Sequence, residues 1–286
     1  FPVALRVLPS RYRRHLANLY CFARLTDDLG DEARAAGASR REAPASPGGG
    51  RVGAVPAEVT ALRLRLLDEL AADVDRIYDG RTPVSPVMRA MAETVAECQV
   101  PARPLLDLIE ANRQDQKVTR YRTFAELAAY CELSANPVGR IVLHIFGAAT
   151  PERMAASDSI CTALQLAEHW QDVAEDLRNG RIYLPAEDME RHGCTEADLA
   201  APTAAPRVRG LIREETDRAA ALLDAGAPLV GTLRGAARIA VAGYVAGGRA
   251  ALAAIRRQRY DVLAGAPRPR KPRLAAALAT TYVSGR

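Results

Sequence analysis

Two pairs of aspartates in this 286-residue chain have the spacing expected of a metal site. Asp172 and Asp176 are four residues apart, as are Asp27 and Asp31, and on a helix this spacing places both carboxylates on one face. Apolar residues surround the second pair between positions 164 and 177, which predicts a largely buried helix. A buried carboxylate is costly unless it is paired, hydrogen-bonded or bound to a metal. An amphipathic helix with its acids in water is the alternative interpretation, and the second copy of the pattern favours a bound cation.

The N-terminal pair belongs to a denser acidic cluster. Asp28 and Glu32 accompany Asp27 and Asp31, and Arg24 precedes Asp28 by four residues. This cluster lies at the C-terminal end of a helix predicted over 11–32, where negative charge opposes the helix macrodipole. So many acids at that end indicate a compensating partner such as a metal cation.

Acids on two opposed helices would suit Mg²⁺, which takes one or two carboxylates together with water and substrate phosphates. Arg24, Arg181 and Tyr183 would complete a cradle for a diphosphate. Such a metal and these cations stabilise a departing diphosphate, while apolar helix faces shield an allylic carbocation. The residue types therefore predict an enzyme that acts on a prenyl diphosphate.

The elements that must position these residues are all helices. Strand-like alternation is absent beyond a few residues, no fixed repeat is found, and aromatic residues are only 5% of the chain. Asn136-Pro137 and Gly139 predict a kink, and Asn179-Gly180 predicts a helix end. A polar connection is expected over 190–206. The result is an all-α fold, one domain over 1–286 around a central apolar cavity, with helices at 11–32, 58–79, 84–98, 101–118, 123–149, 151–178, 207–225, 227–258 and 272–283.

Composition limits the partners and the compartment. The net charge of +5 is modest and the basic residues are spread out, so nucleic acid is not expected. Five scattered cysteines, no signal peptide and no apolar run of about 18 residues predict a soluble or peripheral protein of the cytoplasm. The chain begins inside a segment, so an upstream targeting piece could have been removed.

One segment is expected to be an irregular loop, and another is expected to carry a basic run. Residues 33–57 are rich in Gly, Pro and Ser and predict a flexible loop after the first acidic cluster. Residues 268–286 hold the basic run at 268–273 and a terminal helix. A solvated tail is the favoured interpretation of the basic run, and attraction to an anionic membrane surface is the functional one.

The motifs resemble those of the squalene/phytoene synthases, the head-to-head prenyl transferases. One motif is Tyr20-Cys-Phe-Ala-Arg24-Leu-Thr-Asp27-Asp28-Leu-Gly-Asp31-Glu32, and the other is Gln171-Asp172-Val-Ala-Glu-Asp176 followed by Gly180-Arg-Ile-Tyr-Leu-Pro185. The segments 1–4, 113–115 and 130–140 are most similar to the hydroxysqualene-forming branch found in bacterial hopanoid clusters. The resemblance covers nearly the whole chain and implies an isoprenoid-synthase-type helical bundle.

The resemblance also implies roles for individual residues. The metal would be held by Asp27, Asp28, Asp31, Asp172 and Asp176, with Glu168 where the family often has Asn. The diphosphate would be bound by Arg24, Arg181, Tyr183 and Tyr244, with Asp115 lining the site. Gln165 and Tyr130 would lie near the reacting carbons, so the catalytic set is Asp27, Asp31, Asp172, Asp176, Tyr130 and Gln165.

The reaction implied is Mg²⁺-dependent loss of diphosphate from presqualene diphosphate, rearrangement of the cation, and capture by water to give hydroxysqualene. Gln171 replaces an Arg of squalene and phytoene synthases, and their His-Ser-Lys-Ser-Phe motif is absent, which favours an enzyme of the second half-reaction alone. No NADPH is expected. The alternatives are a squalene or phytoene synthase that condenses two prenyl diphosphates, and a non-catalytic assembly factor of the same fold, which would have lost the acidic motifs.

Other reactive residue types have ordinary interpretations. The four histidines, His15, His144, His169 and His192, lack paired metal-ligand spacing and are expected in the core or at the surface. Trp170 is expected in the core. Ser134 lacks a GxSxG context, so a hydrolase triad is not indicated.

Overall fold

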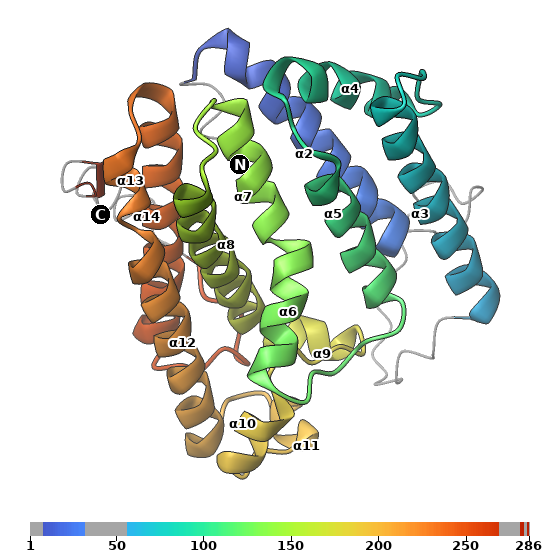
Figure 1. Ribbon diagram of the computed structural model, residues 1–286. Coiled ribbons are helices and arrows are strands. Elements are labelled where there is room, and N and C mark those ends of the chain that lie inside the picture. Colours follow the sequence, from blue (N-terminus) through green and yellow to red (C-terminus); the bar gives the residue numbers. More distant parts are fainter. Residues whose placement is uncertain (1–7, 32–55, 269–280, 283–284, 286) are drawn as a thin grey trace.

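The computed structural model describes residues 8–31, 56–268, 281–282 and 285. Within these residues the regular elements are helices, joined by one isolated parallel bridge between Arg120 and Ile182. The all-α prediction is therefore confirmed (Figure 1). The loop expected over 33–57 and the helix expected over 272–283 lie almost entirely outside the described residues.

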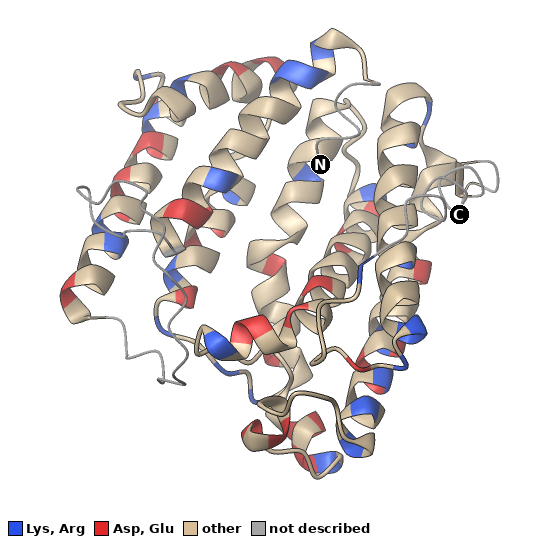
Figure 2. Cartoon of the chain, turned by 180° about the vertical axis from the view of Figure 1, so that it is seen from behind, with Lys and Arg blue, Asp and Glu red and all other residues tan. Residues whose placement is uncertain are grey.

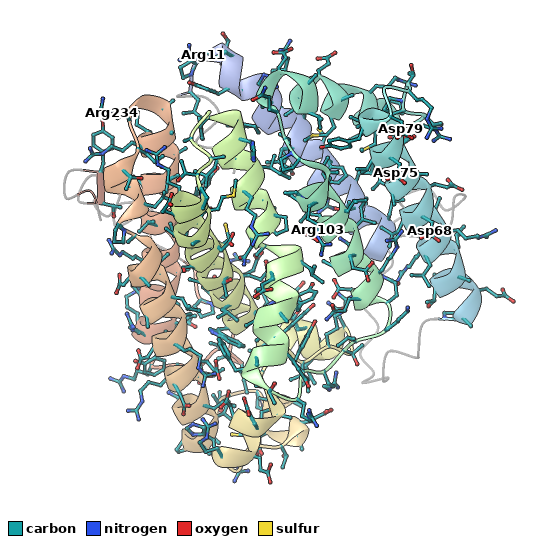
Figure 3. The ribbon with its side chains drawn as sticks, in the orientation of Figure 1. Arg11, Asp68, Asp75, Asp79, Arg103 and Arg234 are labelled. Atoms are coloured by element: carbon teal, nitrogen blue, oxygen red, sulfur yellow. The ribbon has the colours of Figure 1, made fainter. Side chains whose placement is uncertain are left out.

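The first half of the bundle is built around α2 (Ser10–Asp31). This helix packs against α3 (Ala57–Tyr78), α4 (Pro86–Cys98) and α5 (Ala102–Asp115). Their shared core contains large, fully buried side chains, among them Phe22, Leu67, Met88, Met91 and Leu105. Asp68, Asp75 and Asp79, labelled along α3 and its C-terminal end in Figure 3, are exposed, and Asp68 pairs with Arg113 of α5 at 2.6 Å. The helix therefore has a buried apolar face and an exposed acidic one.

The predicted kink is a complete break between two helices. α6 (Phe124–Ser134) ends just before Ala135, and α7 (Asn136–Ile145) begins just after it. Ala135 has a φ of −110° and a ψ of −49°, and this φ departs from the value of about −63° in a regular helix. Pro137 then occupies the first turn of α7, where its missing N–H costs nothing. α7 contacts α2 and α5 as well as α8, and Phe146 just beyond it packs against both clusters of buried hydrophobic residues.

The helix predicted over 151–178 is divided at one of its aspartates. α8 (Pro151–Gln171) and α9 (Val173–Arg178) are separated by Asp172, whose ψ of 13 lies outside the helical range. The prediction of one continuous helix is wrong at this residue. The amide of Asp176 still donates to the carbonyl of Asp172 at 2.8 Å, so the two aspartates keep a helix-like spacing across the break. Gly180, with φ of +80, ends this region as expected.

The remaining helices form the other edge of the bundle. They are α10 (Ala186–Arg191), α11 (Glu196–Leu199), α12 (Pro206–Gly226), α13 (Leu229–Thr232) and α14 (Gly235–Arg257). The connection expected over 190–206 therefore contains short helices, one of them fixed by a capping box of Thr195 and Asp198. The helix predicted over 227–258 is interrupted because Leu233 and Arg234 are extended.

α14 is the one helix in the described part of the chain that is long and apolar enough to cross a membrane. Half of its apolar window is buried inside the bundle, where it packs against α8 and α12. A core helix of a globular protein passes the same test of length and composition, so this feature is weak evidence for a membrane span.

Candidate active site

An apolar cavity of about 190 Å³ lies between α8, the α6–α7 pair and the α13–α14 region. α8 contributes residues spaced by three or four, which places them on one helix face that extends about 16 Å from Ser157 to Glu168. Glu168 is the one acidic residue that lines it. The lining residues are Ser134, Ala135, Val138, Gly139, Val142, Leu143, Ser157, Ile160, Cys161, Leu164, Gln165, Glu168, Leu229, Val241 and Tyr244.

Beyond Glu168 the carboxylates of α8 and α9 crowd one another. Burial raises the pKa of Asp176 to about 7, and the negative charge of Asp172 adds to this rise. The pKa of Glu168 is raised by burial and then by Asp172. Burial also raises the pKa of Asp172, followed by repulsion from Glu175. A cation bound among these acids would relieve both the desolvation and the mutual repulsion.

The acidic cluster of α2 lies outside the lining of this cavity. Within α2, Arg24 pairs with Asp28 at 2.9 Å, and both side chains are substantially exposed. Seen from behind, the acidic part of α2 and the helices α8 and α9 are visible on the same side of the bundle (Figure 2). Among the described residues, no group of three His, Cys, Asp or Glu side chains is placed to hold a metal ion. The side chain of Asp31 is not described, and the metal set expected from the motifs stays a prediction.

The segment after α9 places a cation, Arg181, and a phenol, Tyr183, near the acids. The amide of Ile182 donates to Thr119 O at 3.0 Å and that of Ala186 to Tyr121 O at 3.0 Å, which fixes this return segment against residues 119–122. The Arg181 side chain hydrogen-bonds the hydroxyl of Tyr183, and its charge lowers the pKa of Asp176. The structure thus brings Arg181 and Tyr183 beside the second acidic pair.

Asp115 and Tyr130 also meet, from different helices. The Tyr130 hydroxyl donates to Asp115 Oδ2 at 2.8 Å. Burial raises the pKa of Tyr130 well above its usual value, and the Asp115 charge adds to this, so the phenol stays a donor. The ring of Tyr130 lies 6.1 Å from that of Tyr183 and 5.5 Å from that of Tyr121. These three tyrosines form an aromatic cluster over Asp115.

Gln165 and Tyr244 line the cavity itself. Gln165 lies one turn before Glu168, near the acidic end. Tyr244 lies on α14 near Cys161, and its pKa is raised to a value well above the usual one, chiefly by burial and then by the Cys161 thiol. Both residues were expected in the site, and both face the apolar cavity.

His169 contacts residues of the site, although its sequence context indicated only a core or surface histidine. It is buried, as Trp170 is, and its ring stacks on that of Tyr183 with centroids 3.7 Å apart and planes 14° apart. Its Nε2 lies 3.2 Å from the amide nitrogen of Gln165. Burial, and then the charge of Arg181, lowers the pKa of His169 to about 3, so the ring is neutral.

Two further features were missed. The Gln171 side chain donates to the carbonyl of Pro267, and the charge of Arg268 lowers the pKa of Asp172, so the first cation of the basic run lies near the acids. Nothing in the sequence around Arg268 indicates this, because the contact joins residues far apart in the chain. Ser157 and Cys161 could have been found by extending the helical spacing back from Gln165.

Comparisons with known proteins agree with this fold. A family model described as squalene/phytoene synthase matches residues 1–275. The crystal structure of squalene synthase HpnC from Alicyclobacillus acidocaldarius is 40% identical, with a TM-score of 0.77 over 91% of this chain and 89% of that one. The hydroxysqualene synthase of Rhodopseudomonas palustris is 30% identical over 235 residues, which are 82% of this chain and 71% of the relative. A dehydrosqualene synthase solved with a ligand shares the fold, with a TM-score of 0.82 at 22% identity over 99% of this chain and 91% of that one.

The fold and the family match together are those of a helical prenyl-diphosphate-processing enzyme. The chain belongs to the squalene/phytoene synthase family. The resemblance found in its motifs is therefore confirmed.

Proposed function

We propose that this protein is a hydroxysqualene synthase, which converts presqualene diphosphate and water into hydroxysqualene and diphosphate. The named hydroxysqualene synthases among its relatives, at about 30% identity, support this choice within the family. The proposal places the enzyme in the cytoplasm, acting on a lipid substrate with peripheral membrane contact through basic residues.

The arrangement on α8 is the observation that carries the proposal. One face of this helix runs from apolar side chains through Gln165 to the acid Glu168, and the crowded carboxylates of Asp172 and Asp176 follow directly. A diphosphate ester with long apolar tails has the same arrangement, with an apolar part followed by a charged group. Its charged group fits beside the acids and cations, and its hydrocarbon fits the cavity.

The electrostatics of the carboxylates favour a bound magnesium ion. The pKa values of Glu168, Asp172 and Asp176 are all raised by burial and by negative neighbours, which is the electrostatic condition that a divalent cation relieves. We assign Glu168, Asp172 and Asp176 to this ion, together with Asp27, Asp28 and Asp31 of the α2 motif. When bound, the metal supplies positive charge that stabilises the departing diphosphate.

The protein's own residues would then divide the remaining work. Arg181 and Tyr183, with Arg24 and Tyr244, would bind the diphosphate oxygens by charge-assisted and ordinary hydrogen bonds. The Asp115–Tyr130 pair and Gln165 would orient the substrate near the bond that breaks. The apolar lining would exclude water from most of the cation, so that a single water adds at one carbon. That water loses a proton as the new C–O bond forms, and no reductant such as NADPH enters the balance.

One assay tests this proposal against its alternatives. Purified protein is given Mg²⁺ and presqualene diphosphate without a reductant, and the product is identified by mass spectrometry. Hydroxysqualene is the expected product. Turnover of farnesyl diphosphate or geranylgeranyl diphosphate alone would instead favour a condensing synthase, as the phytoene synthases among the relatives suggest. Absence of any turnover would favour the non-catalytic assembly factor.

A further inference from the structure

His169 touches two parts of the site that are separated in the sequence. Through its Nε2 it meets the amide of Gln165, one helical turn earlier on α8. Through the face of its ring it meets Tyr183, on the return segment after α9. The first contact is with a cavity-lining residue, and the second is with the residue that hydrogen-bonds Arg181.

The direction of the hydrogen bond follows from the groups involved. An amide nitrogen can only donate, so with Gln165 oriented as it is, His169 Nε2 accepts at 3.2 Å. A glutamine side chain beside an apolar cavity otherwise has several rotamers of similar energy. A single acceptor at a fixed point selects one of them.

The acceptor is fixed because the ring cannot turn. His169 is 7% exposed, and its plane lies 14° from that of Tyr183 at a centroid distance of 3.7 Å. The ring of Tyr130 lies 6.5 Å away on another side. Rotation of the imidazole would displace Tyr183, which the backbone bonds of Ile182 and Ala186 hold in place.

We propose that His169 is a positioning residue. It holds the Gln165 amide in one orientation at the acidic end of the cavity, and it ties that orientation to the position of Tyr183. This inference rests on the proposed function, in which Gln165 lies beside the reacting carbons of a prenyl diphosphate. His169 thereby has a defined role in the site, although the sequence predicted only a core or surface histidine.

Two substitutions separate the contacts of His169. His169→Phe keeps a flat ring against Tyr183 and removes the acceptor. His169→Gln loses the stack but offers an amide oxygen where Nε2 now lies. If His169 acts through Gln165, the phenylalanine variant should lose activity and the glutamine variant should largely keep it.

The experiment is a double-mutant cycle of His169→Phe and Gln165→Ala, scored by diphosphate release from presqualene diphosphate. We expect each single variant to lower kcat about tenfold with KM changed less than about threefold, which is the loss of one orienting hydrogen bond. The double variant should be no slower than Gln165→Ala, because the two changes remove the same interaction. His169→Gln should stay within about threefold of the wild type.

A matched control is His15→Phe. His15 is also buried and also bonds a side chain, Thr94 Oγ1, at 3.0 Å, but it lies on α2 and does not line the cavity. Its effect on kcat should be small and should multiply with that of Gln165→Ala. If His169→Phe does not fold, His169→Leu takes its place in the cycle.

The proposal is overturned if His169→Phe leaves kcat unchanged, if its loss multiplies with that of Gln165→Ala, or if His169→Gln is as slow as His169→Phe. Failure of the proposed function would be seen separately, in the identity of the wild-type product. The cycle would then be scored on release of diphosphate from whichever prenyl diphosphate the wild type consumes.

Discussion

At the scale of single residues, Asp176 combines burial, negative neighbours and a nearby cation. Its pKa is raised to about 7, mainly because it is buried and next because Asp172 is close, while Arg181 opposes the rise. A carboxyl group in this state is half protonated near neutral pH in the absence of a metal. The ionised form of this carboxyl group is therefore unfavourable by itself and would be stabilised by a bound cation.

This shift predicts a pH dependence of stability. The folded-state pKa of Asp176 lies above its ordinary value of 3.8, so the folded protein binds more protons between about pH 4 and 7, and stability falls as pH rises through this window. Asp176→Asn removes the titration and should be more stable than the wild type at pH 8 by about 1–2 kcal/mol, allowing for partial solvent screening. Urea denaturation from pH 4 to 8 without metal measures the difference.

The same comparison has a built-in control. Adding Mg²⁺ at pH 8 should raise the stability of the wild type more than that of Asp176→Asn, because only the wild type has the carboxylate at this position. Parallel stability curves for the two proteins at every pH would show that the carboxyl of Asp176 has no shifted pKa.

At the scale of elements, the close approach of α7 and α8 shapes the cavity. A Cβ added to Gly139 would lie 2.4 Å from Ser157 Oγ and 2.5 Å from Cys161 Sγ, both of which line the cavity. Those two side chains have little free space toward the helix that faces them. The glycine therefore allows α7 and α8 to pack closely where the cavity begins.

Gly139→Ala should cost about 1–3 kcal/mol, the usual cost of overpacking, and should slow turnover because Ser157 or Cys161 is forced into the cavity. At about 2–4 °C per kcal/mol for a chain of roughly this size, Tm should fall several degrees. The triple variant with Ser157→Ala and Cys161→Ala should recover much of the loss. Gly243→Ala on α14 is the control, since a Cβ there meets no atom within 4 Å. Equal Tm values for the two alanine variants would contradict this account of the contact.

A second element-scale feature joins α10 to α12. Asp188 and Glu215 are both fully buried, and Arg218 Nη1 donates to Asp188 Oδ2 at 2.9 Å and to Glu215 Oε1 at 2.8 Å. Burial raises the pKa of Glu215 to about 8, and a hydrogen bond with Asp188 contributes. Since α10 follows directly on the return segment with Arg181, this network holds that segment at its far end.

Arg218→Met removes a cation shared by two buried acids, one of which keeps a second arginine partner, and should destabilise the protein by about 1–3 kcal/mol. Glu215→Gln should be tolerated below pH 8. Above that pH it should be more stable than the wild type, because the raised pKa of Glu215 means that wild-type stability falls as pH rises from about 4.5 to about 8. Thermal melts at several pH values measure both effects. Asp217→Ala, which breaks an exposed pair with Arg256, is the control and should change stability by less than about 1 kcal/mol. A similar small effect of Arg218→Met would refute the network.

At the scale of the whole molecule, two clusters of buried hydrophobic residues meet at α7. One gathers α2 to α5, the other gathers α6 and α8 to α14, and Phe146 packs against both. The cavity lies between the two clusters, because Val142 of the first and Ile160 of the second both line it, beside the break at Ala135 that redirects the chain. The interruption of the helix at this point is thus part of the cavity wall.

Helices and motif residues were readable from the sequence because both depend on local spacing. The helical pattern, an interruption near Asn136-Pro137 (predicted as a kink) and the helix end at Gly180 follow from residue types within a few positions. The break at Asp172 and the extended residues before α14 were not readable, because helical periodicity continues through both. Arg268, Tyr183 and His169 acquire their neighbours from distant segments, so their contacts depend on the tertiary fold.

The central claim is that the acids at the α8–α9 junction hold a metal-bound diphosphate at the end of the apolar cavity. The most direct test is the rate of diphosphate release from presqualene diphosphate with Mg²⁺ by the wild type and by the Asp172→Ala, Asp176→Ala double variant, with circular dichroism to verify the fold of both. We expect the folded double variant to lose at least about 10³-fold in kcat, as expected when charge stabilisation of the leaving group is removed. A folded double variant that releases diphosphate at the wild-type rate would contradict the claim.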